Sequence, residues 1–259
     1  MRPIHVHGSA LAGGRLPAIC APLVARDRDA LVAEAAAVAA RGPDLLEWRV
    51  DFFSGIGDAR LVIDTAAAIR SAAPGMPLLF TRRSMREGGE AASIGEEQVV
   101  ALYREVCRAG AADLVDFEAA SEPRHLSEVR DAARANGVGL VLSWHDFHRT
   151  PEPDRLLEGF ERAERLGADV AKIAVMPRRE EDVLALLQAT LRASRALRIP
   201  VVGMAMGGLG AVTRLAGGVF GSALTFAVGA NASAPGQVPI DEVRAVLEVL
   251  RRGAVESRW

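Results

Sequence analysis

Short apolar segments alternate with longer, more polar segments along the whole chain. The apolar segments are rich in leucine and β-branched residues, which is typical of strands buried on both faces of a parallel sheet. The segments between them are rich in Ala, Leu, Arg and Glu and have helical periodicity. This regular alternation of strand and helix predicts a parallel sheet covered by helices.

The number of these segments decides between the possible architectures. The eight predicted strands span residues 18–25, 45–52, 77–83, 114–119, 138–145, 170–177, 200–206 and 222–227. The helices that follow them are predicted, in the same order, at 27–41, 57–72, 95–109, 125–136, 152–166, 179–196, 209–216 and 239–252. Eight such units in 259 residues fit a closed (β/α)₈ TIM barrel better than an open, doubly wound sheet.

A single domain covering residues 1–259 is expected, because no linker rich in Gly, Ser or Pro interrupts the series of strands and helices. Residues 1–16 precede the first strand and lie outside the repeating pattern. We expect them to form a hairpin that closes the bottom of the barrel.

Composition and charge exclude several classes of partner. Half of the residues are apolar and 25% are charged, with a net charge of −2, so no basic surface for nucleic acid is indicated. No apolar run reaches the roughly eighteen residues that a membrane helix needs. Cys20 and Cys107 fit neither a metal-ligand spacing nor a disulfide framework. We expect a cytoplasmic protein with no metal, nucleic-acid or membrane partner.

Polar side chains gather at the predicted carboxyl ends of the strands, where a barrel of this kind carries its active site. Glu47, Arg49 and Asp51 alternate along the second strand, and a period of two places them on one face. The other strand ends and the segments after them carry Arg82, Arg83, Glu87, Asp116, Glu118, His145, Asp146, His148, Lys172 and Arg214. Charges inside a barrel are costly unless they pair or take part in chemistry. The cluster predicts a site for a small anionic or polyhydroxylated ligand.

Some of these residues are equally well explained by structural roles. Asp51, Asp116 and Glu118 are good candidates for ion pairs that tie the layers of the barrel together. Asp146 and His148 are better suited to orienting neighbours or capping a loop than to catalysis.

Lys172 is the only lysine among the 31 Lys and Arg residues, and it lies inside the apolar segment VAKIAVMP. An arginine in its place cannot lose its proton and become a nucleophile. We expect burial and neighbouring guanidinium groups to lower the pKa of this amine from about 10.4, so that it attacks a carbonyl and forms a Schiff base. His145 ends the neighbouring strand, and it is placed to remove a proton from the carbon beside the imine.

With these residues placed, the chain resembles the type I 3-dehydroquinate dehydratases. The resemblance covers nearly the whole length and rests on collinear motifs: LLEWRVD, LLFTRRSMREGGE, DLVDFE, SWHDFHRTP, AKIAVMP, TRLAGGVFGSALTF and SAPGQ. It implies a (β/α)₈ barrel, usually a homodimer, that needs no metal or organic cofactor. It also implies the syn elimination of water from 3-dehydroquinate to give 3-dehydroshikimate, a step of the shikimate pathway.

The resemblance further implies a role for each site residue. Lys172 would form the imine with the C3 ketone, and His145 would take the C2 proton and later protonate the leaving C1 hydroxyl. Glu87 would support the reacting centre, and Arg214 would hold the substrate carboxylate. The remaining contacts would come from Glu47, Arg49 and Arg83 to the ring hydroxyls, and from Ser233 and Gln237 on a loop that closes over the substrate.

Two departures from the family pattern concern the pocket. Pro22 stands near the end of the first strand, where a small polar residue is usual, and Trp144 precedes His145 where asparagine is common. An outward Trp144 would pack against a helix, whereas an inward one would reshape the pocket.

The residues leave other functions open. A Schiff-base aldolase acting on a phosphorylated sugar would also place its lysine on strand six, and the glycines at 207, 208, 217 and 218 give it a possible phosphate-binding turn. A pyridoxal-phosphate barrel and an inactive ligand-binding barrel are further alternatives.

Overall fold

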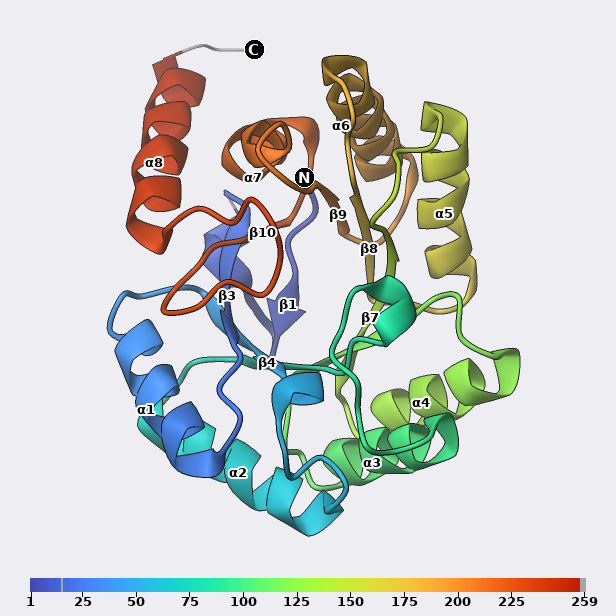
Figure 1. Ribbon diagram of the computed structural model, residues 1–259. Helices are drawn as coiled ribbons and strands as arrows, with labels where there is room; N and C mark the ends of the chain where they lie inside the picture. Colours follow the sequence, from blue (N-terminus) through green and yellow to red (C-terminus); the bar gives the residue numbers. More distant parts are fainter. Residues whose placement is uncertain (15, 257–259) are drawn as a thin grey trace.

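The computed structural model describes residues 1–14 and 16–256. In this part of the chain, eight parallel strands form a nearly closed ring with helices outside it (Figure 1). The strands are β3 (Ala18–Leu23), β4 (Leu45–Arg49), β5 (Leu78–Thr81), β6 (Leu114–Glu118), β7 (Gly139–Asp146), β8 (Val170–Val175), β9 (Val201–Ala205) and β10 (Leu224–Phe226). The predicted (β/α)₈ TIM barrel is confirmed.

The strands pair in chain order from β3 to β9, and β10 pairs with β3. The remaining gap, between β9 and β10, is bridged where Ala223 N–H donates to the Val201 carbonyl at 2.8 Å. Val201 and Ser222 form a parallel β-bridge at the same place. The closed ring leaves no long sheet edge unpaired.

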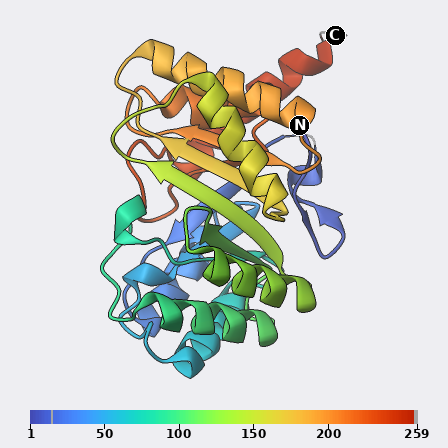
Figure 2. The ribbon, with the colours of Figure 1, turned by 90° about the vertical axis from the view of Figure 1, so that its right-hand side faces the viewer.

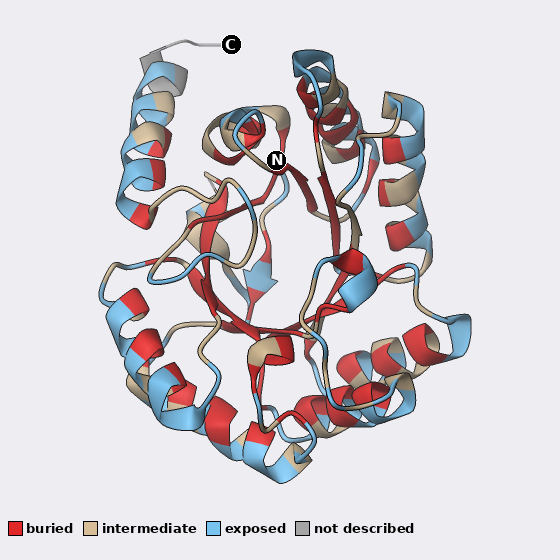
Figure 3. Cartoon of the chain, viewed as in Figure 1, coloured by how far each residue is buried: buried red, intermediate tan, exposed pale blue. Residues whose placement is uncertain are grey.

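The helices cover the outside of the ring: α1 (Arg28–Ala39), α2 (Ala59–Ala72), α3 (Glu96–Arg108), α4 (Pro123–Ala135), α5 (Pro153–Arg165), α6 (Glu180–Ala196), α7 (Ala211–Ala216) and α8 (Ile240–Glu256). Their inner faces are buried against the strands and their outer faces are exposed (Figure 3). Local sequence sets where several of them begin. The side chains of Asp27 and Asp58 cap α1 and α2, and prolines occupy the first turns of α4 and α5. Within the described residues, no helix is long and apolar enough to cross a membrane.

Side chains from alternate strands fill the barrel in layers, as in other TIM barrels. Leu45, Leu114, Val170 and Leu224 belong to one buried apolar cluster at the start of their strands. Two residues further along β4, β6 and β8, the same face carries Glu47, Asp116 and Lys172. The barrel interior therefore changes from apolar to charged between one layer of side chains and the next, two residues further along the strands.

A repeated clamp sets the register of these three strands. Asp44, Asp113 and Asp169 each stand directly before β4, β6 and β8. Each donates its backbone N–H to the carbonyl of a residue at the start of the preceding strand and accepts that residue's N–H with its carboxylate, at 2.7 to 2.9 Å throughout. In each case the third residue after the aspartate is the charged residue of the interior layer. The clamps thus bring Glu47, Asp116 and Lys172 to one level.

An N-terminal hairpin closes the end of the barrel where the strands start, as predicted. Strands β1 (His5–Val6) and β2 (Ser9–Ala10) are antiparallel, and Ile4 and Val6 are buried in the cluster formed by the strand starts. The hairpin lies at the end of the barrel remote from the turn at residues 85–87 (Figure 2). Its turn residue His7 contacts Asp113 at 2.6 Å, and Arg70 makes two hydrogen bonds to the same carboxylate.

The structure corrects the predicted end of the second strand, and it decides the direction of Trp144. Strand β4 ends at Arg49 and the chain turns into the 3₁₀ helix η2 (Val50–Phe52), so the period of two does not extend to Asp51. Asp51 instead folds back and accepts two hydrogen bonds from Arg49. Trp144 points outward, because it packs against the outer hydrophobic cluster between strands and helices. It therefore does not reshape the interior.

The Asp113 clamp yields a stability prediction. Burial raises the pKa of Asp113, but hydrogen bonds from Arg70, Leu78 N–H and His7 outweigh burial, and the pKa lies below its usual value. The carboxylate therefore stabilises the fold above pH of about 4, and the stabilisation is lost as the pH falls through the lowered pKa.

We expect Asp113→Asn to lower the free energy of unfolding by about 2 kcal/mol at pH 7. Denaturation at pH 7 and at about pH 2 should show the gap to wild type narrowing at the lower pH, because the folded protein loses the contribution of the carboxylate as Asp113 takes up a proton. Asp131→Asn, which removes an exposed pair with Arg130, is the control and should unfold like wild type. A gap that stays constant with pH would contradict the role of the charge.

Candidate active site

A pocket at the carboxyl ends of the strands contains every residue predicted for the site. Its lining includes Glu47, Arg49, Arg83, Glu87, His145, Lys172, Arg214, Ser233 and Gln237. These residues come from β4, β7, β8, α7 and the connections after β5 and β10. The fold thus brings together all of the predicted site residues, which are spread over almost two hundred positions of the chain.

Lys172 is buried on β8, with 5% of its surface exposed. Its Nζ donates to Asp116 Oδ2 at 3.0 Å and lies 3.9 Å from Glu47 Oε1. The amine also lies 4.3 Å from the centre of the Phe226 ring. The sequence predicted guanidinium groups around the amine and did not anticipate these carboxylates as its partners. The same surroundings suit an iminium ion, which carries its positive charge on the same nitrogen.

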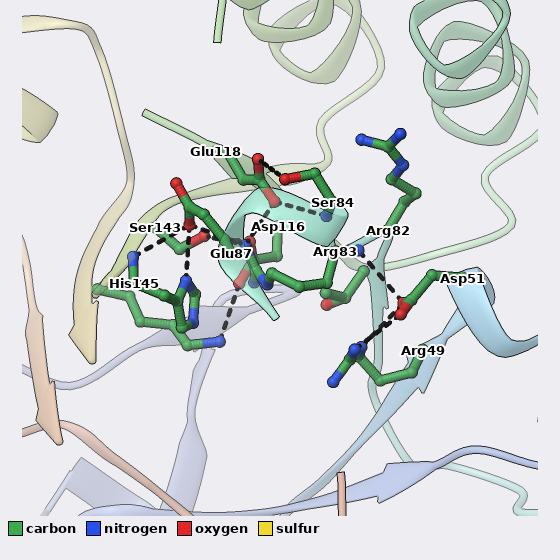
Figure 4. A network of polar contacts seen from close by, with 12 residues as sticks. Arg49, Asp51, Arg82, Arg83, Ser84, Glu87, Asp116, Glu118, Ser143 and His145 are labelled. Atoms are coloured by element: carbon green, nitrogen blue, oxygen red, sulfur yellow. Dashed lines mark hydrogen bonds and ion pairs between the residues drawn. The ribbon is translucent and has the colours of Figure 1, made fainter. Parts of the chain in front are cut away.

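His145 lies beside this amine on the neighbouring strand. It pairs with Ala174, two residues beyond Lys172, and lines the same pocket. Glu87 Oε2 accepts the backbone N–H of His145 at 3.0 Å and contacts its Nδ1 at 2.8 Å (Figure 4). When the ring proton is on Nδ1, Glu87 holds it and Nε2 is free to accept another proton. The pair is therefore arranged as a general base and its orienting carboxylate.

The environment moves the two pKa values of this pair in opposite directions. Burial raises the pKa of Glu87 to about 8, and although Arg83 opposes this, the nearby charges of Glu118 and Asp116 add to it. Burial also lowers the pKa of His145 well below its usual value, with further contributions from Arg83, Lys172 and Arg49. His145 is thus kept uncharged before it acts, which a base requires.

The turn that presents Glu87 depends on two glycines. It is the 3₁₀ helix η3 (Met85–Glu87), and Gly88 ends it with a φ of +81°. A Cβ atom on Gly88 would lie 2.2 Å from the Phe147 ring, and one on Gly89 would lie 2.0 Å from the Arg83 carbonyl oxygen. The REGG motif is therefore required by close packing as well as by backbone conformation.

Arg83 organises the carboxylates around it. Its Nη2 donates to Asp116 at 2.8 Å, and its Nη1 donates to Ser143 at 2.8 Å. Nη1 also lies 3.6 Å from Glu87 and 3.5 Å from Glu118. Arg82, by contrast, points away from the pocket and pairs with Glu96 on α3. The structure thus distinguishes the two adjacent arginines as the sequence predicted.

Arg214 is a buried cation with no carboxylate partner among the described residues. It is 2% exposed, and its guanidinium donates only to the Met204 sulfur and to the carbonyls of Phe226 and Pro235. Its Nε is buried without a hydrogen-bond partner. Burial lowers the pKa of Arg214 to about 10. An anionic group in the pocket would supply the missing charge and acceptors.

The connection between β10 and α8 reaches over the ring of strands (Figure 1). Within it, Gln237 accepts the Ser233 N–H at 2.8 Å and its amide contacts the Ser233 hydroxyl at 3.3 Å. The Ser233 carbonyl accepts from Arg49 at 3.3 Å, and the Pro235 carbonyl accepts from Arg214 at 3.1 Å. The loop is thus tied to two of the arginines expected to bind the substrate.

Comparison with known proteins agrees with this geometry. A family model described as type I 3-dehydroquinase matches residues 19–254. The chain belongs to the type I 3-dehydroquinase family.

Similar proteins of this family come from several bacteria. The 3-dehydroquinate dehydratase of Albidiferax ferrireducens is 55% identical, over 97% of this chain and 95% of that protein. The crystal structure of 3-dehydroquinate dehydratase from Geobacillus kaustophilus is 51% identical, with a TM-score of 0.94 over 97% of both chains. That of the type I enzyme from Clostridium difficile, described with covalently modified comenic acid, is 36% identical, with a TM-score of 0.91 over 97% of this chain and 98% of that one.

Sequence reasoning missed part of this 3-dehydroquinase pocket. Its apolar wall consists of Phe147, Ala174, Met204, Met206 and Phe226. Asp116, a predicted candidate for an ion pair inside the barrel, does form ion pairs, but the sequence did not predict that Lys172 is one of its partners, at 3.0 Å. The repeated spacing of Asp44, Asp113 and Asp169 before their charged residues is the signal that could have placed Asp116 level with Lys172. In the described residues, no group of three or more His, Cys, Asp and Glu is arranged to hold a metal ion.

The Glu87–His145 pair yields a prediction for titration of the free protein. Below pH of about 8, Glu87 holds a proton, and above it the carboxylate accepts the Nδ1 proton of His145. We expect the ring ¹⁵N signals of His145 to follow this ionisation, with a midpoint nearer 8 than the usual 6.5 of histidine.

Nuclear magnetic resonance of the protein labelled in its five histidines can measure this midpoint, with His145→Ala for assignment. Glu87→Gln should abolish the step near pH 8. Glu90→Gln, which changes an outer residue of the same segment, should leave it in place. A step that survives Glu87→Gln would show that another group causes it.

Proposed function

We propose that this chain catalyses the syn elimination of water from 3-dehydroquinate to give 3-dehydroshikimate. The proposal includes a Schiff base on Lys172 and general acid–base catalysis by His145. Its support is the family membership, the buried amine beside an imidazole, and the unpaired guanidinium of Arg214 in the same pocket.

Lys172 gives up one proton and attacks the C3 ketone as a free amine. That proton returns to the carbinolamine hydroxyl, which leaves as water, and a protonated imine remains. Asp116 is 3.0 Å from this nitrogen and balances its positive charge. Asp116 is itself fully buried, and although burial raises its pKa, Arg83 and Lys172 outweigh burial and keep the pKa below its usual value. The counter-charge is thus present throughout the working pH range.

The iminium acidifies the protons on C2, and His145 removes one through Nε2 while Glu87 holds the Nδ1 proton. The electron pair of the C–H bond moves into the iminium and forms an enamine. The enamine then expels the C1 hydroxyl, which leaves as water with the proton from His145. Hydrolysis of the remaining imine releases 3-dehydroshikimate and restores Lys172.

The observation that carries the proposal is that Arg214 is buried without a carboxylate partner among the described residues, in one pocket with Lys172 and His145. Its free donors suit the substrate carboxylate. Glu47, Arg49 and Arg83 bind the ring hydroxyls, and Ser233 and Gln237 close the pocket from above. The aldolase alternative needs a phosphate cradle, and the N–H of Gly207, one of its glycines, is engaged by the Pro235 carbonyl at 3.2 Å.

The proposal extends to the setting of the enzyme. The reaction belongs to the shikimate pathway, which makes the precursors of the aromatic amino acids, and we place the chain there as a cytoplasmic homodimer that needs neither a metal nor an organic cofactor. These features rest on the family resemblance. Sedimentation of the purified chain tests the homodimer directly.

Trapping of the imine tests the reaction. Borohydride added with 3-dehydroquinate should attach the reduced ligand to Lys172, as peptide mass spectrometry would show. Lys172→Ala should abolish both trapping and turnover. His145→Ala should still trap some ligand while turnover falls by about 10²–10⁴-fold, the usual contribution of a general acid–base group. Near-normal turnover in Lys172→Ala would exclude the proposed mechanism.

Loss of the guanidinium tests the carboxylate site separately. Arg214→Met keeps an apolar side chain of similar length and removes the charge. We expect KM for 3-dehydroquinate to rise by about two orders of magnitude, because a charge-assisted, bidentate contact is lost. Arg82→Met, at an arginine outside the pocket, is the matched control and should change KM little. Equal effects of the two substitutions on steady-state kinetics would refute this role.

A further inference from the structure

Glu118 is a buried carboxylate that the proposed reaction does not use. It is the last residue of β6 and is 4% exposed. Its Oε1 accepts the Ser84 N–H and its Oε2 accepts the Ser84 hydroxyl, both at 2.7 Å (Figure 4). The Glu118 side chain therefore grips one residue, Ser84, with both oxygens.

Ser84 is the anchor of the turn that carries Glu87. It directly precedes η3, and its carbonyl accepts the N–H groups of Glu87 at 3.0 Å and of Gly89 at 2.8 Å. Glu87 in turn holds both the backbone N–H and the Nδ1 of His145. A continuous series of short contacts thus runs from Glu118 through Ser84 and Glu87 to His145.

Glu118 also acts on Glu87 through charge. Nη1 of Arg83 lies 3.5 Å from Glu118 and 3.6 Å from Glu87, so the two carboxylates share one guanidinium nitrogen. The charged groups that face Glu87 are Arg83 before the turn, Asp116 and Glu118 from β6, and His145 from β7. Among them, Glu118 and Asp116 are like charges that favour a proton on Glu87.

Asp116 already has a task as the partner of Lys172, and Asp51 already holds the backbone of this segment. Asp51 accepts the N–H groups of Arg83 at 3.2 Å and of Glu90 at 3.0 Å. The segment is thus braced without Glu118. Burying a second carboxylate costs free energy, and an uncharged acceptor could hold Ser84 equally well. A role as a brace alone therefore does not explain the charge of Glu118.

We propose that Glu118 is a positioning residue: it holds the turn at Ser84, and it sets the protonation of the Glu87–His145 pair by competing with Glu87 for Arg83. The effect of Glu118 on catalysis rests on the proposed function. The effect on the pair itself is a property of the free protein.

Two substitutions separate charge from geometry. Glu118→Gln keeps hydrogen-bonding partners for both groups of Ser84 but removes the negative charge. Ser84→Ala removes one hydrogen bond and keeps the charge. We expect Glu118→Gln to move the titration step of His145 to lower pH by about one unit, because a like charge is removed and Arg83 is released to Glu87. Ser84→Ala should leave the midpoint within a few tenths of a unit.

Steady-state kinetics with 3-dehydroquinate should show the same displacement. In the wild type, kcat/KM should rise with pH as Glu87 ionises, and in Glu118→Gln this rise should move to lower pH by the same amount. KM at the plateau should change little, since Glu118 does not line the pocket. Borohydride trapping on Lys172 should persist in the variant.

The outcomes are distinct. If Glu118→Gln lowers the unfolding temperature and kcat while the His145 titration stays in place, Glu118 is only a brace and the proposal is overturned. Because the titration is measured without substrate, a displaced step upholds the proposal even if the protein does not dehydrate 3-dehydroquinate. In that case only the proposed function fails.

Discussion

The ion pair between Lys172 and Asp116 is the constraint on which the rest of the site depends. An amine buried at this level of a barrel is stabilised by a counter-charge, because an isolated charge in an apolar interior is costly. Asp116 then needs its own partners, and Arg83 and Ser143 supply them. Arg83 in turn draws in Glu87 and Glu118. The polar network follows from placing one amine, that of Lys172, among aliphatic layers.

The buried cations of the site are of two kinds, those with carboxylate partners and one without. Arg83 and Lys172 are matched to carboxylates of the protein, whereas Arg214 is matched to none among the described residues. Burial lowers the pKa of Arg83, but Asp116, Glu118 and Glu87 outweigh burial and raise it. Burial alone acts on Arg214 and lowers its pKa to about 10. Within the described residues, the protein thus supplies carboxylate partners to Arg83 and Lys172 and none to Arg214, the cation proposed to bind the substrate carboxylate.

Sequence reasoning predicted the barrel because apolar strand segments alternate regularly with segments of helical periodicity along the whole chain. The eight strands and helices lie within a few residues of their predicted places. The end of β4 was wrong, since alternation of polar residues cannot show that the chain turns at Val50 and that Asp51 bonds back to Arg49. Trp144 was left open, because its direction depends on which face of β7 the register turns inward.

The nine predicted residues meet in one pocket. The charged residues at strand ends were singled out because such side chains have few structural explanations there, whereas Ser233 and Gln237 came from the family resemblance alone. The links between them were not found, because a contact such as Glu118 with Ser84 joins positions that are far apart in the sequence. Likewise, Asp116 could be read as a charge but not as the partner of Lys172. Pairing depends on the register between strands, and the aspartate three positions before each of Glu47, Asp116 and Lys172 is a sequence feature that accompanies it.

The apolar layers beneath Lys172 close the pocket at the end of the barrel where the strands start. Leu45, Leu114, Val170 and Leu224 fill the barrel below the amine, and the hairpin packs against their lower side. Substrate, product and every water molecule that is released or consumed must therefore pass through the same upper mouth. The segment that carries Ser233 and Gln237 lines this opening, so its position affects the entry of substrate and the release of product alike.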